Sequence, residues 1–161
     1  MDLMKIRTAA RRSCHQWAEQ EFGHADLGDE RRTNRLVRLA AEVAASPAGK
    51  VTEVFSRSAE REAVFRWVEN DDVKPEDVAR ANHLATAEKC LAELFVFVPV
   101  DGSSMNLTDT MGKKGLGIVG SRSIGATGIH VMSAIAVSRE GTPIGLCGQK
   151  FWKRTERVSN K

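Results

Sequence analysis

The chain has 161 residues, of which 42% are hydrophobic, and this length is sufficient to bury a core in one domain or in two small ones. No stretch reaches about 18 apolar residues without a charge, and the N-terminus MDLMKIRTAARRSCH lacks the apolar segment of a signal peptide. These features exclude a membrane-spanning segment and predict a globular cytoplasmic protein with no membrane partner.

The charge distribution and the spacing of the cysteines further limit the kinds of binding site expected in this chain. The net charge is +3, and basic residues are in excess only after residue 100, so nucleic-acid binding by the N-terminal part must rest on local arrangement. Cys14, Cys90 and Cys147 lie far apart and form no CxxC pair. This spacing argues against a disulfide framework and against a zinc knuckle, and we expect reduced thiols.

Hydrophobic periodicity predicts two helices in the first 49 residues. Apolar residues recur at three- and four-residue spacing from Ile6 to Phe22, and the segment GHADLG ends this first helix. Asp29 is placed to cap a second helix, which the segment SPAG at 46–49 ends. The apolar stripe of this second helix consists of Leu36, Leu39, Ala40, Val43 and Ala44.

Two further helices are expected before residue 90. Ser58 is a candidate cap for a third helix, which has Val64, Trp67 and Val68 on its inner face. Pro75 suits the first turn of a fourth helix that runs to about Lys89. Four helices thus fill most of the N-terminal half.

Beyond Leu94 the pattern becomes strand-like. The runs LFVFVPV, IHVMSAIAV and PIGLCGQKFW are short and apolar, and SREGT separates the last two as a hairpin turn. Asp101 directly follows the first run, at the end of what the pattern predicts to be a buried strand. Because a sheet needs an element packed on its apolar face, three strands without a covering helix form an incomplete layer, and we expect the chain to stop within a fold.

Several motifs point to no site. GLGIVG at 115–120 matches the dinucleotide pattern G-x-G-x-x-G, but the glycine-containing SRSIGATG follows it, where the motif requires a helix. DGSSM is not the G-x-S-x-G elbow of a hydrolase. The four histidines have no metal-ligand spacing. We therefore expect neither a nucleotide cofactor nor a histidine metal site.

Arginines line one flank of the second predicted helix. Arg31, Arg35 and Arg38 lie away from the leucine stripe at about 100° per residue. They form either a solvated face or a set of DNA-binding side chains, since guanidinium groups bind phosphate and guanine edges bidentately. Arg32 lies along the apolar stripe instead, and we expect it to make a structural contact to Asp26 or Asp29.

Residues 17–70 resemble the N-terminal DNA-binding domain of bacterial cut-and-paste transposases of the transposon-five type. The resemblance rests on the segments ADLGDERRTNRL and FRWVEN. It continues through VPVDGSSMNLTD, the basic glycine loop and the aromatic cluster QKFW. It covers nearly the whole chain, but only the first part of such a transposase.

The resemblance implies an α+β fold with two domains. A helical DNA-binding domain would span residues 1–72, and the start of a ribonuclease-H-like mixed sheet, with its first three strands, would span residues 73–161. The partner would be double-stranded DNA at the terminal inverted repeats of a transposon, and full-length transposase is a second candidate partner. The expected DNA contacts are Arg31, Arg35, Arg38, Lys113, Lys114 and Arg122.

By position, Asp101 corresponds to the first of three acidic residues that bind Mg²⁺ or Mn²⁺ in this family. The residues alone leave a simpler alternative, a strand-end carboxylate that accepts hydrogen bonds from the amides of the DGSS turn. The other two acids of the family would lie beyond residue 161, so we expect this chain alone to bind no metal and to cleave no DNA. Three functions stay open: a part of a transposase, a non-catalytic DNA-binding or hetero-oligomerising inhibitor of transposition, and a degenerate remnant.

Overall fold

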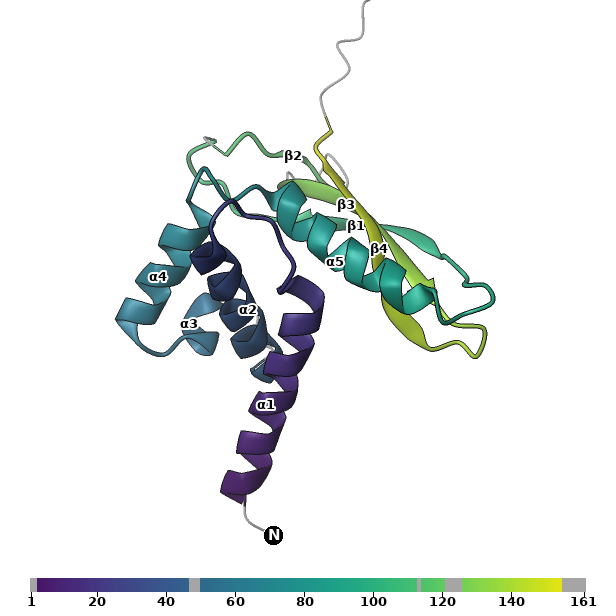
Figure 1. The fold of residues 1–161 in the computed structure, drawn as a ribbon. Helices are drawn as coiled ribbons and strands as arrows, with labels where there is room; N and C mark the ends of the chain where they lie inside the picture. The colour runs from purple at the N-terminus through teal and green to yellow at the C-terminus, as the bar shows by residue number, and fades with distance from the viewer. Residues whose placement is uncertain (1–2, 47–49, 113, 121–125, 155–161) are drawn as a thin grey trace, which may run out of the picture. The chain divides into compact units, whose positions relative to one another are not determined.

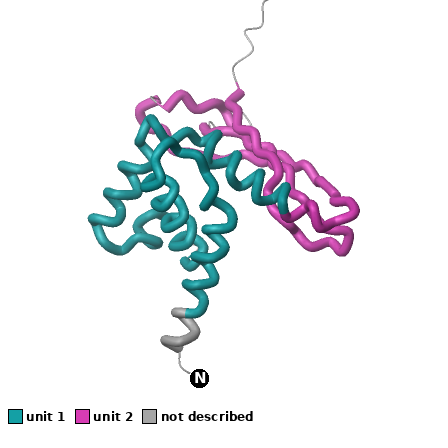
Figure 2. Tube along the Cα trace, viewed as in Figure 1, with its two compact units in different colours: residues 1–88 teal, residues 89–161 magenta. Residues whose placement is uncertain are grey.

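The structure is a computed structural model that describes residues 3–46, 50–112, 114–120 and 126–154. The chain forms two compact units, Met1–Glu88 and Lys89–Lys161 (Figure 2). In the described ranges, no helix is long and apolar enough to cross a membrane.

The first unit is helical (Figure 1). Its helices are α1 Leu3–Phe22, α2 Glu30–Ala45, α3 Val51–Val54, α4 Ser58–Val68 and α5 Pro75–Cys90, the last two residues of which belong to the second unit. The four longer helices confirm the four that periodicity predicts. The additional helix α3 has four residues, which is too short for an apolar period to be recognised.

Local signals in the sequence account for the starts of two helices, α2 and α5. Asp29 is the N-cap of α2, and its side chain accepts a hydrogen bond from the backbone N–H of Arg31 at 2.8 Å. Pro75 is the first residue of α5, so both predicted starts are confirmed. Ser58 differs from the prediction: it is the first residue of α4, and Arg57 occupies the N-cap position without a side-chain hydrogen bond.

Helix α2 contributes to each cluster of the helical core. The clusters are Ala25, Leu27, Leu36 and Ala81; Ala18, Val37 and Ala41; and Leu39, Phe55 and Val64. Because α2 has packing partners on several sides, its buried residues spread beyond one stripe, and they end before its last turn. Val43 and Ala44, which the sequence placed inside, are exposed, and so is Val68 of α4.

Helix α5 packs against the other helices of the first unit. Ala81 of α5 is buried in one cluster with Leu36, and Asn82 Nδ2 donates to Glu21 Oε2 of α1 at 2.9 Å. The compact units therefore divide after residue 88, whereas the resemblance places a domain boundary after residue 72. The buried residues of α5 are Ala81, Ala85 and Thr86, which give no strong apolar stripe in the sequence.

The second unit is an antiparallel sheet with β3 at its centre (Figure 1). Its strands are β1 Val100–Asn106, β2 Gly117–Ile118, β3 Thr127–Val137 and β4 Pro143–Trp152. Each of the other strands pairs with β3. The fold is therefore α+β, with a helical region followed by four described strands. The two-residue strand β2 lies inside the predicted glycine loop.

The first strand lies later in the chain than its apolar pattern predicts. The run LFVFVPV contributes an isolated bridge from Phe97 to Val137, and β1 begins at Val100 and continues through DGSSMN. Every residue of β1, including Asp101, is exposed, so the expected burial of this strand is wrong. Pairing with residues 128–134 of β3 overrides the turn preference of glycine and serine.

The hairpin between β3 and β4 is confirmed at the predicted turn. The backbone N–H of Ser138 donates to the carbonyl oxygen of Thr142 at 2.8 Å, and the N–H of Thr142 donates to Ser138 Oγ at 3.2 Å. Gly141 has a φ of 87°, a conformation that favours glycine. This turn fixes the register of β4 on β3.

Candidate nucleic-acid interface

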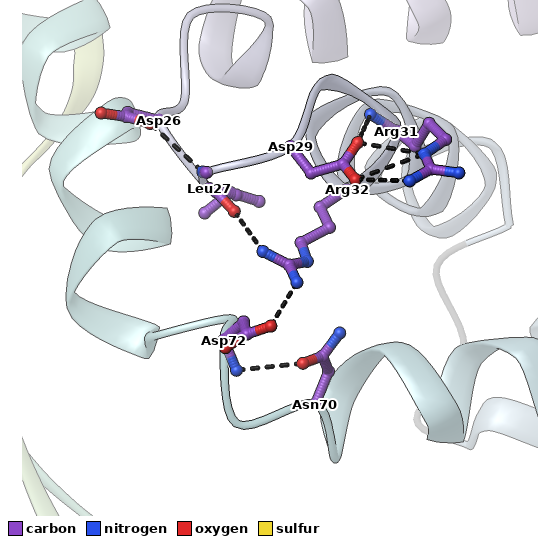
Figure 3. A network of polar contacts seen from close by, with 8 residues as sticks. Asp26, Leu27, Asp29, Arg31, Arg32, Asn70 and Asp72 are labelled. Carbon is purple, nitrogen blue, oxygen red and sulfur yellow. Dashed lines mark hydrogen bonds and ion pairs between the residues drawn. The ribbon is translucent and has the colours of Figure 1, made fainter.

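Arg32 connects the start of α2 to the loop before it and to the turn after α4 (Figure 3). Its Nη1 donates to the carbonyl oxygen of Leu27 at 3.0 Å, and its Nη2 forms an ion pair with Asp72. Arg32 is therefore structural, as expected, but its acidic partner is Asp72 rather than Asp26 or Asp29. Asp72 is 40 residues away in sequence, and only the fold brings it to Arg32.

The two acids expected to hold Arg32 make other contacts (Figure 3). Asp26 Oδ1 accepts a hydrogen bond from the backbone N–H of Gly28 at 3.2 Å. Asp29 Oδ2 accepts one from Arg31 Nη2 at 2.8 Å. The hydrogen bonds from the Arg31 side chain and backbone lower the pKa of Asp29 to about 2. The Arg31 side chain stays 90% exposed, but a neighbouring carboxylate balances its charge.

Two further hydrogen bonds hold the first turn of α2. Trp67 Nε1 of α4 donates to the carbonyl oxygen of Arg32 at 3.1 Å, and Oγ1 of the buried Thr33 donates to the carbonyl oxygen of Ala25 at 2.8 Å. The helix is thus fixed against α4 and against the loop that joins α1 to α2. The outward-facing side chains of α2 therefore extend from a helix whose first turn is held by hydrogen bonds.

A groove with a volume of about 840 Å³ lies between α1, α2 and the segment from Val54 to Glu60. Its apolar lining includes Leu39 and Phe55. Its titratable lining residues, within the described part of the chain, are Arg11, Arg12, His15, Arg35, Arg38, Glu42, Arg57 and Glu60.

The groove is predominantly basic. Among the described residues, five arginines line it against two glutamates, and Arg11 Nη2 lies 3.9 Å from Glu42 Oε2. The other four arginines form no ion pair with any described residue. Their guanidinium groups are therefore available to an anionic ligand, and a guanidinium binds phosphate through two parallel hydrogen bonds.

Two of the three arginines predicted on α2 line this groove. Arg35 is half-buried there, and Arg38 is exposed. Arg31 is not part of the lining, since it lies at the helix start beside Asp29. The structure therefore places Arg35 and Arg38 in the groove and Arg31 outside it. Helical spacing in the sequence does not make this distinction.

The other basic residues of the groove were not predicted from the sequence. Arg11 and His15 are four residues apart on α1, and this helical spacing was the available signal. Arg57 carries no comparable signal, because it lies just before α4 and reaches the groove only through the tertiary fold.

The predicted DNA contacts of the second unit are only partly described. Lys113 and Arg122 lie outside the described residues. The backbone N–H of Lys114 donates to Asp109 Oδ2 at 2.8 Å, and Lys114 Nζ donates to the carbonyl oxygen of Thr108 at 2.9 Å. Lys114 thus organises its own loop while its side chain stays exposed.

Asp101 is exposed on β1, opposite Ser133 of β3. Beside it, Gln149 Nε2 of β4 donates to Ser133 Oγ at 3.1 Å. Across the residues that the structure describes, no three His, Cys, Asp or Glu side chains gather into a group that could hold a metal ion. The described side chains around Asp101 therefore offer a single carboxylate next to neutral polar groups.

Residues 14–73 match the family described as transposase DNA-binding. The match begins inside α1, contains all of α2, α3 and α4, and ends before α5. It includes Arg35, Arg38 and Arg57 of the groove, while Arg11 and Arg12 lie directly before it. This match supports a DNA-binding region of a transposase in the first unit.

Proposed function

We propose that the helical unit recognises the terminal inverted repeats of a transposon, as double-stranded DNA, through the arginine groove. The observation that carries this proposal is the convergence of arginines from α1, α2 and the segment before α4 on one groove, most of which lies in the region that matches transposase DNA-binding. Phosphate contacts by such side chains supply most of the affinity for DNA and make it depend on salt.

The positions of the arginines favour a division of roles. Arg35 and Arg38 are three residues apart on α2, so they share one side of that helix. We assign them to base edges, where a guanidinium binds O6 and N7 of guanine. Arg11, Arg12 and Arg57 come from the segments that flank α2 in the groove, and we assign them to phosphates, which fix the register of the protein on the duplex.

The contacts of Arg32 and Trp67 support this function indirectly. Both residues restrain the first turn of α2, and Arg35 lies in the turn that follows. A helix that is already fixed loses less conformational freedom on binding, and this raises affinity without any new contact. Arg32 is therefore a positioning residue for the groove.

The proposal is tested by a salt-dependent titration of the full chain with inverted-repeat duplex and with scrambled duplex of equal length. We expect selective binding with a steep salt slope. Arg38→Gln should weaken binding of the repeat by about 5- to 150-fold and relax specificity, whereas Arg57→Gln should weaken both duplexes alike and reduce the salt slope by about 1.

Arg139→Gln provides the matched control for these variants. Arg139 is exposed in the turn of the second unit and pairs with Glu140, so its loss should leave both affinities unchanged. Equal weak binding of the two duplexes by the unaltered chain would contradict sequence recognition. Equal effects of Arg38→Gln and Arg139→Gln would contradict the assignment of the groove.

The ribonuclease-H-like identity of the second unit and a metal-binding role of Asp101 stay predictions of the same proposal. They are supported by the position of Asp101 on the first strand of the sheet. Mg²⁺ is held in proteins by one or two carboxylates together with substrate phosphates. The described residues do not form a complete metal site, so we assign no cleavage step to them. An inhibitor of transposition would use the same groove, and competition with full-length transposase for repeat DNA would identify it.

A further inference from the structure

Two adjacent aromatic residues are flanked by basic residues at the C-terminal end of β4. The segment from Gln149 to Arg154 reads QKFWKR. Successive residues of a strand point to opposite faces of the sheet, so Lys150 and Trp152 share one face and Phe151 lies on the other. Both aromatic side chains are exposed, Trp152 by 37% and Phe151 by 54%.

Trp152 is held in place by a row of side chains that crosses three strands. It lies opposite His130 of β3, and the two rings are stacked with centroids 5.5 Å apart and planes 21° apart. His130 Nδ1 is in turn hydrogen-bonded to Ser104 Oγ of β1 at 3.0 Å. Because His130 is buried and covers one side of the indole, the exposed part of Trp152 is a supported, flat apolar surface.

One basic residue, Lys150, lies on the same face of the sheet as Trp152. The register places Lys150 opposite Met132, which in turn lies opposite Gly102, and all three residues are exposed. Lys153 and Arg154 follow Trp152 directly, and Lys153 Nζ donates to the carbonyl oxygen of Gly115 at 3.0 Å. Asp101 lies on the opposite face, in the row of Ser133 and Gln149. Lys150 on this face and the basic residues that follow the strand therefore complement an anionic strand.

We propose that this face binds single-stranded DNA, with one unpaired base stacked on Trp152 and its flanking phosphates contacted by Lys150 and Arg154. Exposed aromatic side chains beside cations are how proteins hold unpaired nucleotides, because every base has a face that stacks. Duplex DNA cannot use the indole in this way while its bases are paired. The inference goes beyond the proposed function, since this surface lies in the second unit and takes unpaired strands.

The test is an anisotropy titration of the full chain with a labelled thymidine oligonucleotide of about 12 nucleotides. Trp152→Leu should weaken binding by about 5- to 150-fold, the effect of losing one stacked base, and Trp152→Phe should retain most of the affinity. Phe151→Leu, the neighbouring change on the opposite face, should leave the affinity unchanged. Lys150→Gln should reduce the slope of log affinity against log salt by about 0.7.

Lys150→Gln keeps the proposal testable if loss of the indole disturbs the sheet, because the Lys150 side chain is exposed and makes no hydrogen bond or ion pair to a described residue. The proposal is overturned if the oligonucleotide does not bind, if Trp152→Leu and Phe151→Leu act alike, or if an oligoglutamate of equal length competes as well as DNA. The variant Arg38→Gln separates the two proposals. It should bind the thymidine strand normally, and loss of that binding would place unpaired DNA in the groove instead.

Discussion

Trp67 Nε1 donates a hydrogen bond to the carbonyl oxygen of Arg32 at 3.1 Å, and this bond joins α4 to the first turn of α2. Trp67 also packs against the clusters that contain Leu36 and Leu39. One side chain therefore links the core of the helical unit to the helix that carries the groove arginines.

Replacing this indole should destabilise the helical unit. Trp67→Phe removes the hydrogen bond and leaves a smaller ring in the core, and we expect a loss of about 1 to 3 kcal/mol in the free energy of unfolding. Urea denaturation followed by far-ultraviolet circular dichroism measures it. Phe65→Leu, at a position of α4 that is 49% exposed, is the control and should change stability far less. Equal losses would contradict a special role of Trp67.

Arg32 and Asp72, which form an ion pair, should contribute unequally to the free energy of unfolding. Arg32→Met removes both the bond to the Leu27 carbonyl oxygen and the ion pair, and we expect it to cost about 1 to 3 kcal/mol. Asp72→Asn removes only a contact of a side chain that is 66% exposed, and it should cost less than about 1 kcal/mol. Thermal unfolding of the two variants provides the comparison. The reverse order would show that the ion pair, rather than the bond to Leu27, holds the loop.

The N-cap of α2 should make stability depend on pH in the acidic range. The pKa of Asp29 is lowered in the folded chain from 3.8 to about 2 by its hydrogen bonds from Arg31, so folding favours the ionised carboxylate. Its contribution is complete above pH about 4 and is lost as the pH falls through about 2. Asp29→Asn retains a capping side chain without this titration. The stability difference between the two proteins, measured by urea denaturation at several pH values, should therefore shrink as the pH falls; a constant difference would contradict the assignment.

Glycine is required where β1 and β3 approach each other closely. A Cβ atom at Gly128 would lie 1.9 Å from the carbonyl oxygen of Met105, whereas a Cβ at Gly148 would lie 3.6 Å from the Ala134 Cβ, an ordinary contact. Gly128→Ala should therefore cost about 3 kcal/mol or separate the strands, while Gly148→Ala should be tolerated. Hydrogen exchange of the β1 amides distinguishes the two variants, and equal protection in both would refute the close approach.

Short-range chemistry in the sequence determined where several elements begin and how the hairpin turns. Asp29 and Pro75 mark helix starts because a cap and a first-turn proline act within a few residues of themselves. The turn between β3 and β4 follows from the segment SREGT for the same reason. The motif segments also sufficed to indicate a transposase DNA-binding region, which the match over residues 14–73 supports.

The tertiary structure alone decided the partners of these elements. Asp72 replaces the expected acids beside Arg32, α5 joins the helical core, and β1 forms from the polar segment DGSSMN rather than from the apolar run before it. The groove likewise gathers Arg11 and Arg57 around Arg38 from three separate segments. Each of these outcomes depends on contacts between residues far apart in the chain, and a local pattern carries no information about which distant surface will meet it.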